Sequence, residues 1–320
     1  MPGHPVVLDG LVREREPEPV VSEPPVAPVL STEGRFMDSS FTSAAGTRRF
    51  KLFAPGGFEG ETLPLVVMLH GCTQNPDDFA AGTRMNSLAQ EEGFFVLYPA
   101  QAARSNAHKC WNWFSPADQR RGAGEPALLV GMVRHAMQTH PIDPDRVYVA
   151  GLSAGGAMSA ILASEYPDVF AAAGVHSGLA AGAAHDVASA FSVMKSGPAS
   201  SAPQSSRGAP VIVFHGDADA TVVAANGDAV ITASLAGAGP VVAEELAPLA
   251  GVASRRVQRT VWRAADASPD VPTLAEQWVV QGAPHAWSGG ASAGSYTDPK
   301  GPDASREMLR FFLAHPRRHA

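Results

Sequence analysis

The sequence predicts an α/β fold in which a mostly parallel central sheet carries helices on both faces. Short, continuous apolar runs such as residues 65–69 have the length and composition of strands that are buried on both sides. Segments with helical spacing, such as residues 126–139, separate these runs. A third run, residues 147–150, leads directly into a turn that contains Ser153. Strands that alternate with helices are joined by right-handed crossovers, which makes neighbouring strands parallel.

The first half of the domain begins with a strand pair. Residues 36–54 alternate loosely between polar and apolar side chains and end at the turn Pro55-Gly56-Gly57, which is typical of a hairpin. Two buried strands are predicted next, at residues 65–69 and 94–98. A helix over residues 126–139 follows, with Pro126 in its first turn.

The second half repeats the alternation. The turn at Ser153 is followed by a predicted helix over residues 157–163. The later elements are strands at residues 170–175 and 211–214, a helix at 226–235, a last strand at 277–280 and a closing helix at 303–314. The less regular segment 179–209 lies where such folds often insert a small lid. The alternative is a long surface loop with a helix at residues 186–194.

Composition limits the class of protein. The 320 residues are 45% hydrophobic and 17% charged, as in an ordinary globular protein. A net charge of −7 without a Lys/Arg-rich run argues against nucleic-acid partners, and no apolar stretch is long enough to span a membrane. Residues 1–35 are rich in Pro, Arg and Glu and predict a disordered leader, so we expect the α/β domain to occupy residues 36–320. The apolar patch near the start is interrupted by Asp9, so no secretory signal is predicted.

Ser153 is the candidate nucleophile. It is the centre of the Gly-x-Ser-x-Gly pattern Gly151-Leu152-Ser153-Ala154-Gly155, between a predicted strand and a predicted helix. That context is the one in which a serine hydroxyl is exposed at the top of an α/β-hydrolase sheet. Residues 290–294 match the same pattern, but no strand precedes them and no helix follows. We therefore interpret residues 290–294 as a Gly/Ser loop.

The chain order Ser, acid, His predicts the other two catalytic residues. His285 follows the last predicted strand after a short loop, whereas His315 and His319 lie near the end of the chain. We therefore expect His285 to be the base. Asp219 and Asp217 both follow the strand at residues 211–214. Asp219 is the favoured acid because it is further out on the loop, while Asp217 is well placed to hold the turn.

Two backbone N–H groups are expected to stabilise the oxyanion of an acyl-transfer reaction. One belongs to Ala154, directly after the nucleophile. The other is expected from Cys72, in the loop Leu69-His70-Gly71-Cys72 that ends an early strand. The alternative for His70-Gly71 is a tight turn without a catalytic role.

The two cysteines, Cys72 and Cys110, are expected to form a disulfide that pins the oxyanion loop to an aromatic segment. Two unpaired buried thiols are the alternative. Two isolated cysteines have no metal-ligand spacing, and we expect neither a metal nor a cofactor. The pattern Gly122-x-Gly124 resembles a dinucleotide motif but lacks a preceding strand.

Three tryptophans are candidate substrate-binding residues. Trp111 and Trp113 lie in the aromatic segment around Cys110, and Trp287 lies two residues after His285. An indole presents a large apolar surface at low entropic cost, which suits an acyl or aromatic subsite. Ordinary core packing is the alternative, above all for Trp111 and Trp113.

With these residues identified, the chain closely resembles the poly(3-hydroxybutyrate) depolymerase-type esterases, which are related to feruloyl and acetylxylan esterases. The resemblance covers residues 46–315 and includes five motifs: L-H-G-C-T-Q-N-P at 69–76, C-W-N-W-F at 110–114, G-L-S-A-G-G at 151–156, H-G-D-A-D at 215–219 and H-A-W-S-G-G at 285–290. It implies the α/β-hydrolase fold and the same three catalytic residues. It also implies an extracellular location, whereas the N-terminus leaves a cytoplasmic one open.

The sequence therefore predicts a serine carboxylic-ester hydrolase that works through an acyl-enzyme. Poly- or oligo(3-hydroxybutyrate) and similar aliphatic esters are the expected substrates. The alternative enzyme is a feruloyl or acetylxylan esterase that acts on plant polysaccharide esters. A hypothesis of another class is a non-catalytic α/β-hydrolase scaffold that binds a polymer.

Overall fold

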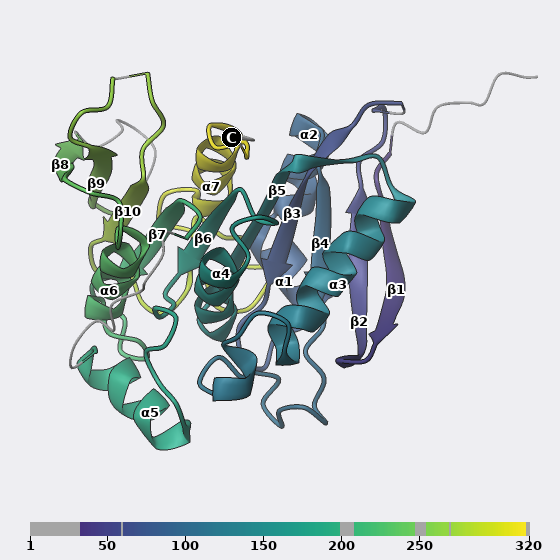
Figure 1. Cartoon of the computed structure of the whole chain (residues 1–320), viewed down its shortest axis with the longest axis horizontal. Helices are drawn as coiled ribbons and strands as arrows, with labels where there is room; N and C mark the ends of the chain where they lie inside the picture. Colours follow the sequence, from purple (N-terminus) through teal and green to yellow (C-terminus); the bar gives the residue numbers. More distant parts are fainter. Residues whose placement is uncertain (1–32, 59, 199–207, 247–253, 269, 318–320) are drawn as a thin grey trace, which may run out of the picture. The chain divides into compact units, whose positions relative to one another are not determined.

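A ten-stranded sheet forms the centre of the protein (Figure 1). The computed structural model describes residues 33–58, 60–198, 208–246, 254–268 and 270–317. The sheet order is β1-β2-β4-β3-β5-β6-β7-β10-β9-β8. Its six middle strands are mutually parallel: β4 (Phe95–Pro99), β3 (Leu63–Leu69), β5 (Ile142–Leu152), β6 (Ala172–His176), β7 (Val211–Gly216) and β10 (Ala275–Val280). The predicted α/β fold with a mostly parallel sheet is thus confirmed.

Antiparallel pairs extend the sheet at both edges. At one edge, β1 (Arg35–Ser43) and β2 (Gly46–Ala54) form the predicted hairpin. At the other edge, β9 (Val257–Ala264) and β8 (Val241–Leu246) pair antiparallel, and neither strand was predicted. The start of β1 falls on the last residue of the predicted leader, while residues 1–32 lie outside the described residues.

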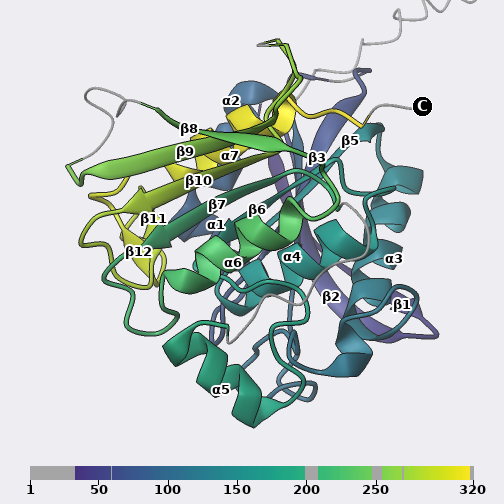
Figure 2. The same cartoon turned by 60° about the vertical axis from the view of Figure 1, so that its left-hand side comes forward.

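Helices cover both faces of the sheet (Figure 2). One face carries α3 (Gly124–Thr139), α4 (Ala154–Glu165) and α6 (Ala225–Ser234), and the other carries α1 (Pro76–Thr83), α2 (Met85–Glu92) and α7 (Ala304–Leu313). Strand β5 shows how both faces are filled. Val147 and Val149 pack in the core on the first face, and Tyr148 and Ala150 pack in the core on the second. This burial on both sides explains the continuous apolar runs of the middle strands.

The predicted lid segment contains helix α5 (Val187–Ser196). Asp186 accepts a hydrogen bond from the Ser189 N–H and forms a capping box that starts the helix. Both views place α5 below α4 and α6 (Figures 1 and 2). Residues 199–207 of this segment lie outside the described residues. Within the described ranges, no helix combines the length and apolar character needed to cross a membrane.

The last part of the chain adds two short strands before α7. Trp287–Ser288 (β11) pairs with Thr297–Asp298 (β12), and the Gly/Ser pattern at residues 290–294 forms the loop between them. The turn η1 (Pro116–Asp118) precedes α3. Because the middle strands are parallel, their carboxyl ends share one edge of the sheet, and the loops that carry the candidate residues start there.

Candidate active site

Ser153 occupies a strained turn between β5 and α4. Its backbone has φ 58° and ψ −120°, a conformation that costs a non-glycine residue about 1–3 kcal/mol. The Ser153 N–H donates a 2.9 Å hydrogen bond to the carbonyl of His176, which holds the turn. A Cβ on Gly155 would lie 2.0 Å from the Leu69 carbonyl oxygen, so only glycine lets helix and strand come this close. The turn has the geometry of a nucleophile elbow.

Asp219 and His285 are joined by a short hydrogen bond. His285 Nδ1 lies 2.6 Å from Asp219 Oδ2, and the Asp219 carboxylate is buried. The two residues follow neighbouring parallel strands, β7 and β10. When Nδ1–H donates to the carboxylate, the basic nitrogen of His285 is Nε2. This pairing unites two of the predicted catalytic residues in an acid–base couple.

The second carboxylate oxygen of Asp219 is held by the backbone. Oδ1 accepts hydrogen bonds of 2.9 Å from the N–H groups of Thr221 and Val222. Burial alone would raise the pKa of Asp219, but the hydrogen bonds from His285 and from these two N–H groups lower it below its ordinary value. Asp217 accepts a 2.6 Å hydrogen bond from the Gly282 N–H and thus holds the loop before His285.

The loop after β3 is braced from several sides. Gly71 donates through its N–H to Gln74 Oε1 at 2.9 Å, and its carbonyl lies 2.7 Å from His70 Nδ1. The indole N–H of Trp111 donates to the His70 carbonyl at 3.1 Å. Neither the Cys72 N–H nor the Ala154 N–H donates a hydrogen bond to another group in the part of the chain that the structure describes. These two N–H groups, on the loop and at the start of α4, are the predicted oxyanion donors.

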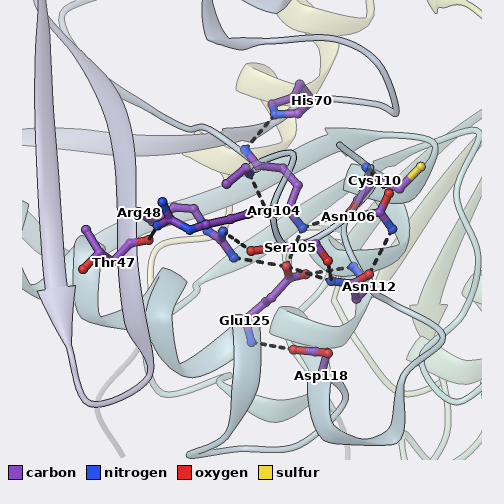
Figure 3. A network of polar contacts seen from close by, with 12 residues as sticks. Thr47, Arg48, His70, Arg104, Ser105, Asn106, Cys110, Asn112, Asp118 and Glu125 are labelled. Atoms are coloured by element: carbon purple, nitrogen blue, oxygen red, sulfur yellow. Dashed lines mark hydrogen bonds and ion pairs between the residues drawn. The ribbon is translucent and has the colours of Figure 1, made fainter. Parts of the chain in front are cut away.

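A disulfide joins Cys72 to Cys110, which confirms the predicted bridge. A polar network that includes Cys110 holds the segment of residues 101–112 (Figure 3). Glu125 is its centre: it pairs with Arg48 at 3.2 Å, accepts the Asn112 N–H at 2.8 Å and also accepts the side-chain amide of Gln101. Gln101 in turn donates through its backbone N–H to His70 Nε2. The network thus connects β2 and α3 to the loop after β3.

An apolar cavity of about 480 Å³ opens beside Ser153 and Ala154. Its lining includes the disulfide, Trp113, Phe114 and residues of α5. Among the described residues, Trp113 is the one candidate tryptophan that lines it.

The other two tryptophans are core residues. Trp111 is fully buried next to His70, and Trp287 is buried between Phe79 and His176 and donates its indole N–H to Ser305 at 3.1 Å. Their placement does not support the predicted substrate contacts. Proximity along the chain suggested those contacts, whereas the two side chains point into the core.

Two features of the site were not foreseen from the sequence. One is the apolar lining from α5, whose spacing of Val187, Phe191 and Met194 could have indicated a common face.

The other is His176, at the end of β6. Its ring Nε2 accepts a 2.9 Å hydrogen bond from the Ser288 N–H, three residues after His285, while its carbonyl binds the Ser153 N–H. His176 therefore connects the elbow to the loop of the base.

Comparison with known proteins finds similar sequences and a similar fold. Residues 48–258 match the model of a family described as "Esterase PHB depolymerase". The chain is 41% identical over 159 residues to poly(3-hydroxyalkanoate) depolymerase C of Paucimonas lemoignei, which covers 50% of this chain and 38% of that protein. It is 40% identical over 128 residues to feruloyl esterase B of Thermothelomyces thermophilus, which covers 40% and 43% respectively. The matched segments thus span less than half of each relative's length.

A solved structure supports the fold assignment. The acetyl xylan esterase from Aspergillus awamori superposes with a TM-score of 0.65 at 20% sequence identity. The superposition covers 87% of this chain and 99% of that one. The likeness therefore extends over nearly the whole α/β-hydrolase fold.

Proposed function

The chain belongs to the PHB depolymerase esterase family, and from this premise we propose that it is a serine carboxylic-ester hydrolase. Ser153 would attack the ester carbonyl, and His285 Nε2 would take the hydroxyl proton and return it to the leaving alcohol. Asp219 would keep His285 in the tautomer that this transfer needs. Water would then hydrolyse the acyl-enzyme by the same proton path.

The observation that carries this proposal is the 2.6 Å bond between His285 and Asp219, at the same sheet edge as the strained turn of Ser153. A buried carboxylate bonded to an imidazole has a clear chemical use, because it stabilises the imidazolium that forms during proton transfer. The N–H groups of Cys72 and Ala154 would bind the developing oxyanion. The described part of the chain contains no cluster of three or more His, Cys, Asp or Glu side chains suited to a metal ion.

Aliphatic esters of the hydroxyalkanoate type are the proposed substrates. The depolymerase relative is 41% identical, and the cavity beside Ser153 is predominantly apolar. A feruloyl or acetylxylan ester is the second candidate, since the feruloyl esterase relative is 40% identical and Trp113 and Phe114 line the cavity. The disulfide favours an oxidising, extracellular compartment as the place of action.

Two experiments test the proposed activity. A fluorophosphonate probe should label wild-type protein at Ser153 and should not label Ser153→Ala. Hydrolysis of p-nitrophenyl esters, 3-hydroxybutyrate oligomers, methyl ferulate and acetylated xylan should depend on Ser153. A folded wild-type protein that reacts with neither the probe nor any ester would instead support a non-catalytic, polymer-binding scaffold.

A further inference from the structure

Helix α5 presents an apolar face to the cavity that contains Ser153. Val187, Ala190, Phe191 and Met194 are spaced so that they share one side of the helix, and all four line the cavity. Phe191 and Val187 are nevertheless 63% and 55% exposed, among the most exposed large apolar side chains of the described chain. A contiguous apolar face that is open to water beside a reacting group is typical of a binding surface.

The helix is held in place by polar contacts that leave this face uncovered. At its start, Asp186 and Ser189 form the capping box. At its end, the carbonyl of Met194 accepts the Val223 N–H at 2.9 Å, and the carbonyl of Val193 accepts the side-chain amide of Asn226 at 3.0 Å. The exposed side chains are therefore presented from a fixed scaffold, which lowers the entropic cost of binding.

The chemistry of the cavity restricts its occupant. Leu179, Val222, Trp113 and Phe114 add to its apolar lining. No Asp, Glu, Lys or Arg occurs among the described residues that line it. A sugar chain would find few hydrogen-bonding side chains there, chiefly Thr73, Asn106 and His108, and an anionic substrate would find no Lys or Arg. An uncharged, largely aliphatic chain fits both restrictions.

We propose that the α5 face binds the aliphatic chain of a long ester, beyond the ester group that reacts at Ser153. Phe191 and Val187 would then be specificity-determining residues that favour oligomeric or long-chain aliphatic esters over short esters and acetylated sugars. This inference rests on the proposed esterase function and names its substrate class. The contact would be made equally in the ground state and the transition state, so its loss should appear mainly in KM.

The test compares Phe191→Ala and Val187→Ser with Val242→Ser, which changes an equally exposed valine on β8 that does not line the cavity. The readout is the ratio of kcat/KM for p-nitrophenyl dodecanoate to that for p-nitrophenyl acetate, together with turnover of 3-hydroxybutyrate oligomers of increasing length. We expect Phe191→Ala to lower the ratio about tenfold, the effect of exposing one large apolar contact. Val187→Ser should lower it less, and Val242→Ser should leave it unchanged.

An unchanged ratio in both α5 variants, with Ser153-dependent hydrolysis intact, would overturn the substrate-binding role of α5 and leave the esterase function standing. Absence of any Ser153-dependent hydrolysis in the wild type would overturn the esterase function itself. A wild-type dimer that Phe191→Ala converts to monomers in sedimentation analysis would show that α5 binds a second copy of the chain, which would also overturn the inference.

Discussion

The two aspartates after β7 have different environments, and the difference gives a direct test of the acid. Asp219 is buried against His285, whereas the Asp217 carboxylate accepts a hydrogen bond from the backbone N–H of Gly282. Asp219→Asn should lower kcat by about 10⁴, because the amide favours the wrong imidazole tautomer. Asp217→Asn should leave most activity, since a side-chain amide oxygen can still accept from Gly282. Steady-state kinetics of the two variants check the assignment, and a crippling effect of Asp217→Asn alone would reverse it.

Buried histidines make stability depend on pH. Burial lowers the pKa of His70 to about 4 and that of His176 to about 3, from an ordinary value of 6.5. Between 6.5 and these values, the unfolded chain binds protons that the folded protein does not, so stability falls as the pH falls. Each residue adds up to ~1.4 kcal/mol per pH unit to that slope.

Urea unfolding at about pH 7.5 and about pH 5 measures this slope. His70→Gln cannot titrate and should flatten it, besides lowering stability at both pH values. His108→Gln is the matched control, because it removes a histidine that is exposed rather than buried. An unchanged slope in His70→Gln would show that other groups dominate the acid sensitivity.

At the scale of single residues, the three candidate catalytic residues could be predicted because chain order and local context restrict them. Ser153 needs a strand before it and a helix after it, and His285 is the late histidine that directly follows a strand. The direction in which the tryptophan side chains point could not be predicted in this way. Whether Trp111 points to the cavity or to the core depends on the path of the whole 101–112 segment, and no local spacing encodes that path.

Among the elements, the crossing of α4 over β3 depends on one glycine. Gly155→Ala would force a Cβ against the Leu69 carbonyl, and because the atoms that it would meet belong to the backbone the strain cannot relax easily. We expect a loss of more than about 3 kcal/mol in the free energy of unfolding. Gly46→Ala is the control: the new Cβ has open space, so only the strain of its φ of +125° should count, about 1–3 kcal/mol. Similar losses in both variants would contradict the steric argument.

The disulfide holds the loop after β3 against the aromatic segment, and the paired substitution Cys72→Ser with Cys110→Ser tests what this contributes. Removing this disulfide, which joins residues 38 positions apart, should lower the free energy of unfolding by about 2–4 kcal/mol. If the Cys72 N–H binds the oxyanion, kcat should also fall, by up to about a hundredfold, as the donor loses its fixed position. Thermal unfolding and kcat separate the two effects. A full kcat in the double variant would limit the disulfide to a stabilising role.

The elements that could be predicted are those with an unambiguous apolar pattern. Strand β3, and strand β5 from Val147 onward, are buried on both faces and therefore appear as continuous apolar runs. Strand β8 was missed because its residues are exposed, and its pairing with β9 depends on partners far along the chain. Helices α1 and α2 are only eight residues long, too short for helical periodicity to stand out.

Across the whole molecule, Glu125 connects the hairpin edge of the sheet to the loop beside the candidate site. Burial raises its pKa above the ordinary value, although the Asn112 N–H, Gln101 and the charge of Arg48 oppose this. Glu125→Ala would leave Arg48 buried without its carboxylate and should cost about 3–5 kcal/mol. The double variant Arg48→Met with Glu125→Met should recover part of that loss. Chemical denaturation of both variants checks the prediction, and equal losses would contradict it.

The candidate reacting groups stand at the ends of sheet strands, whereas the proposed chain-binding face belongs to a helix in the crossover between β6 and β7. Mutations that alter α5 can therefore change which ester is accepted without displacing the acid–base pair. Because the two parts are separate, substitutions in α5 can accumulate and change the substrate specificity while the candidate catalytic residues are kept. Replacing α5 with a helix of different side chains should therefore change the substrate specificity while Ser153, Asp219 and His285 stay in place.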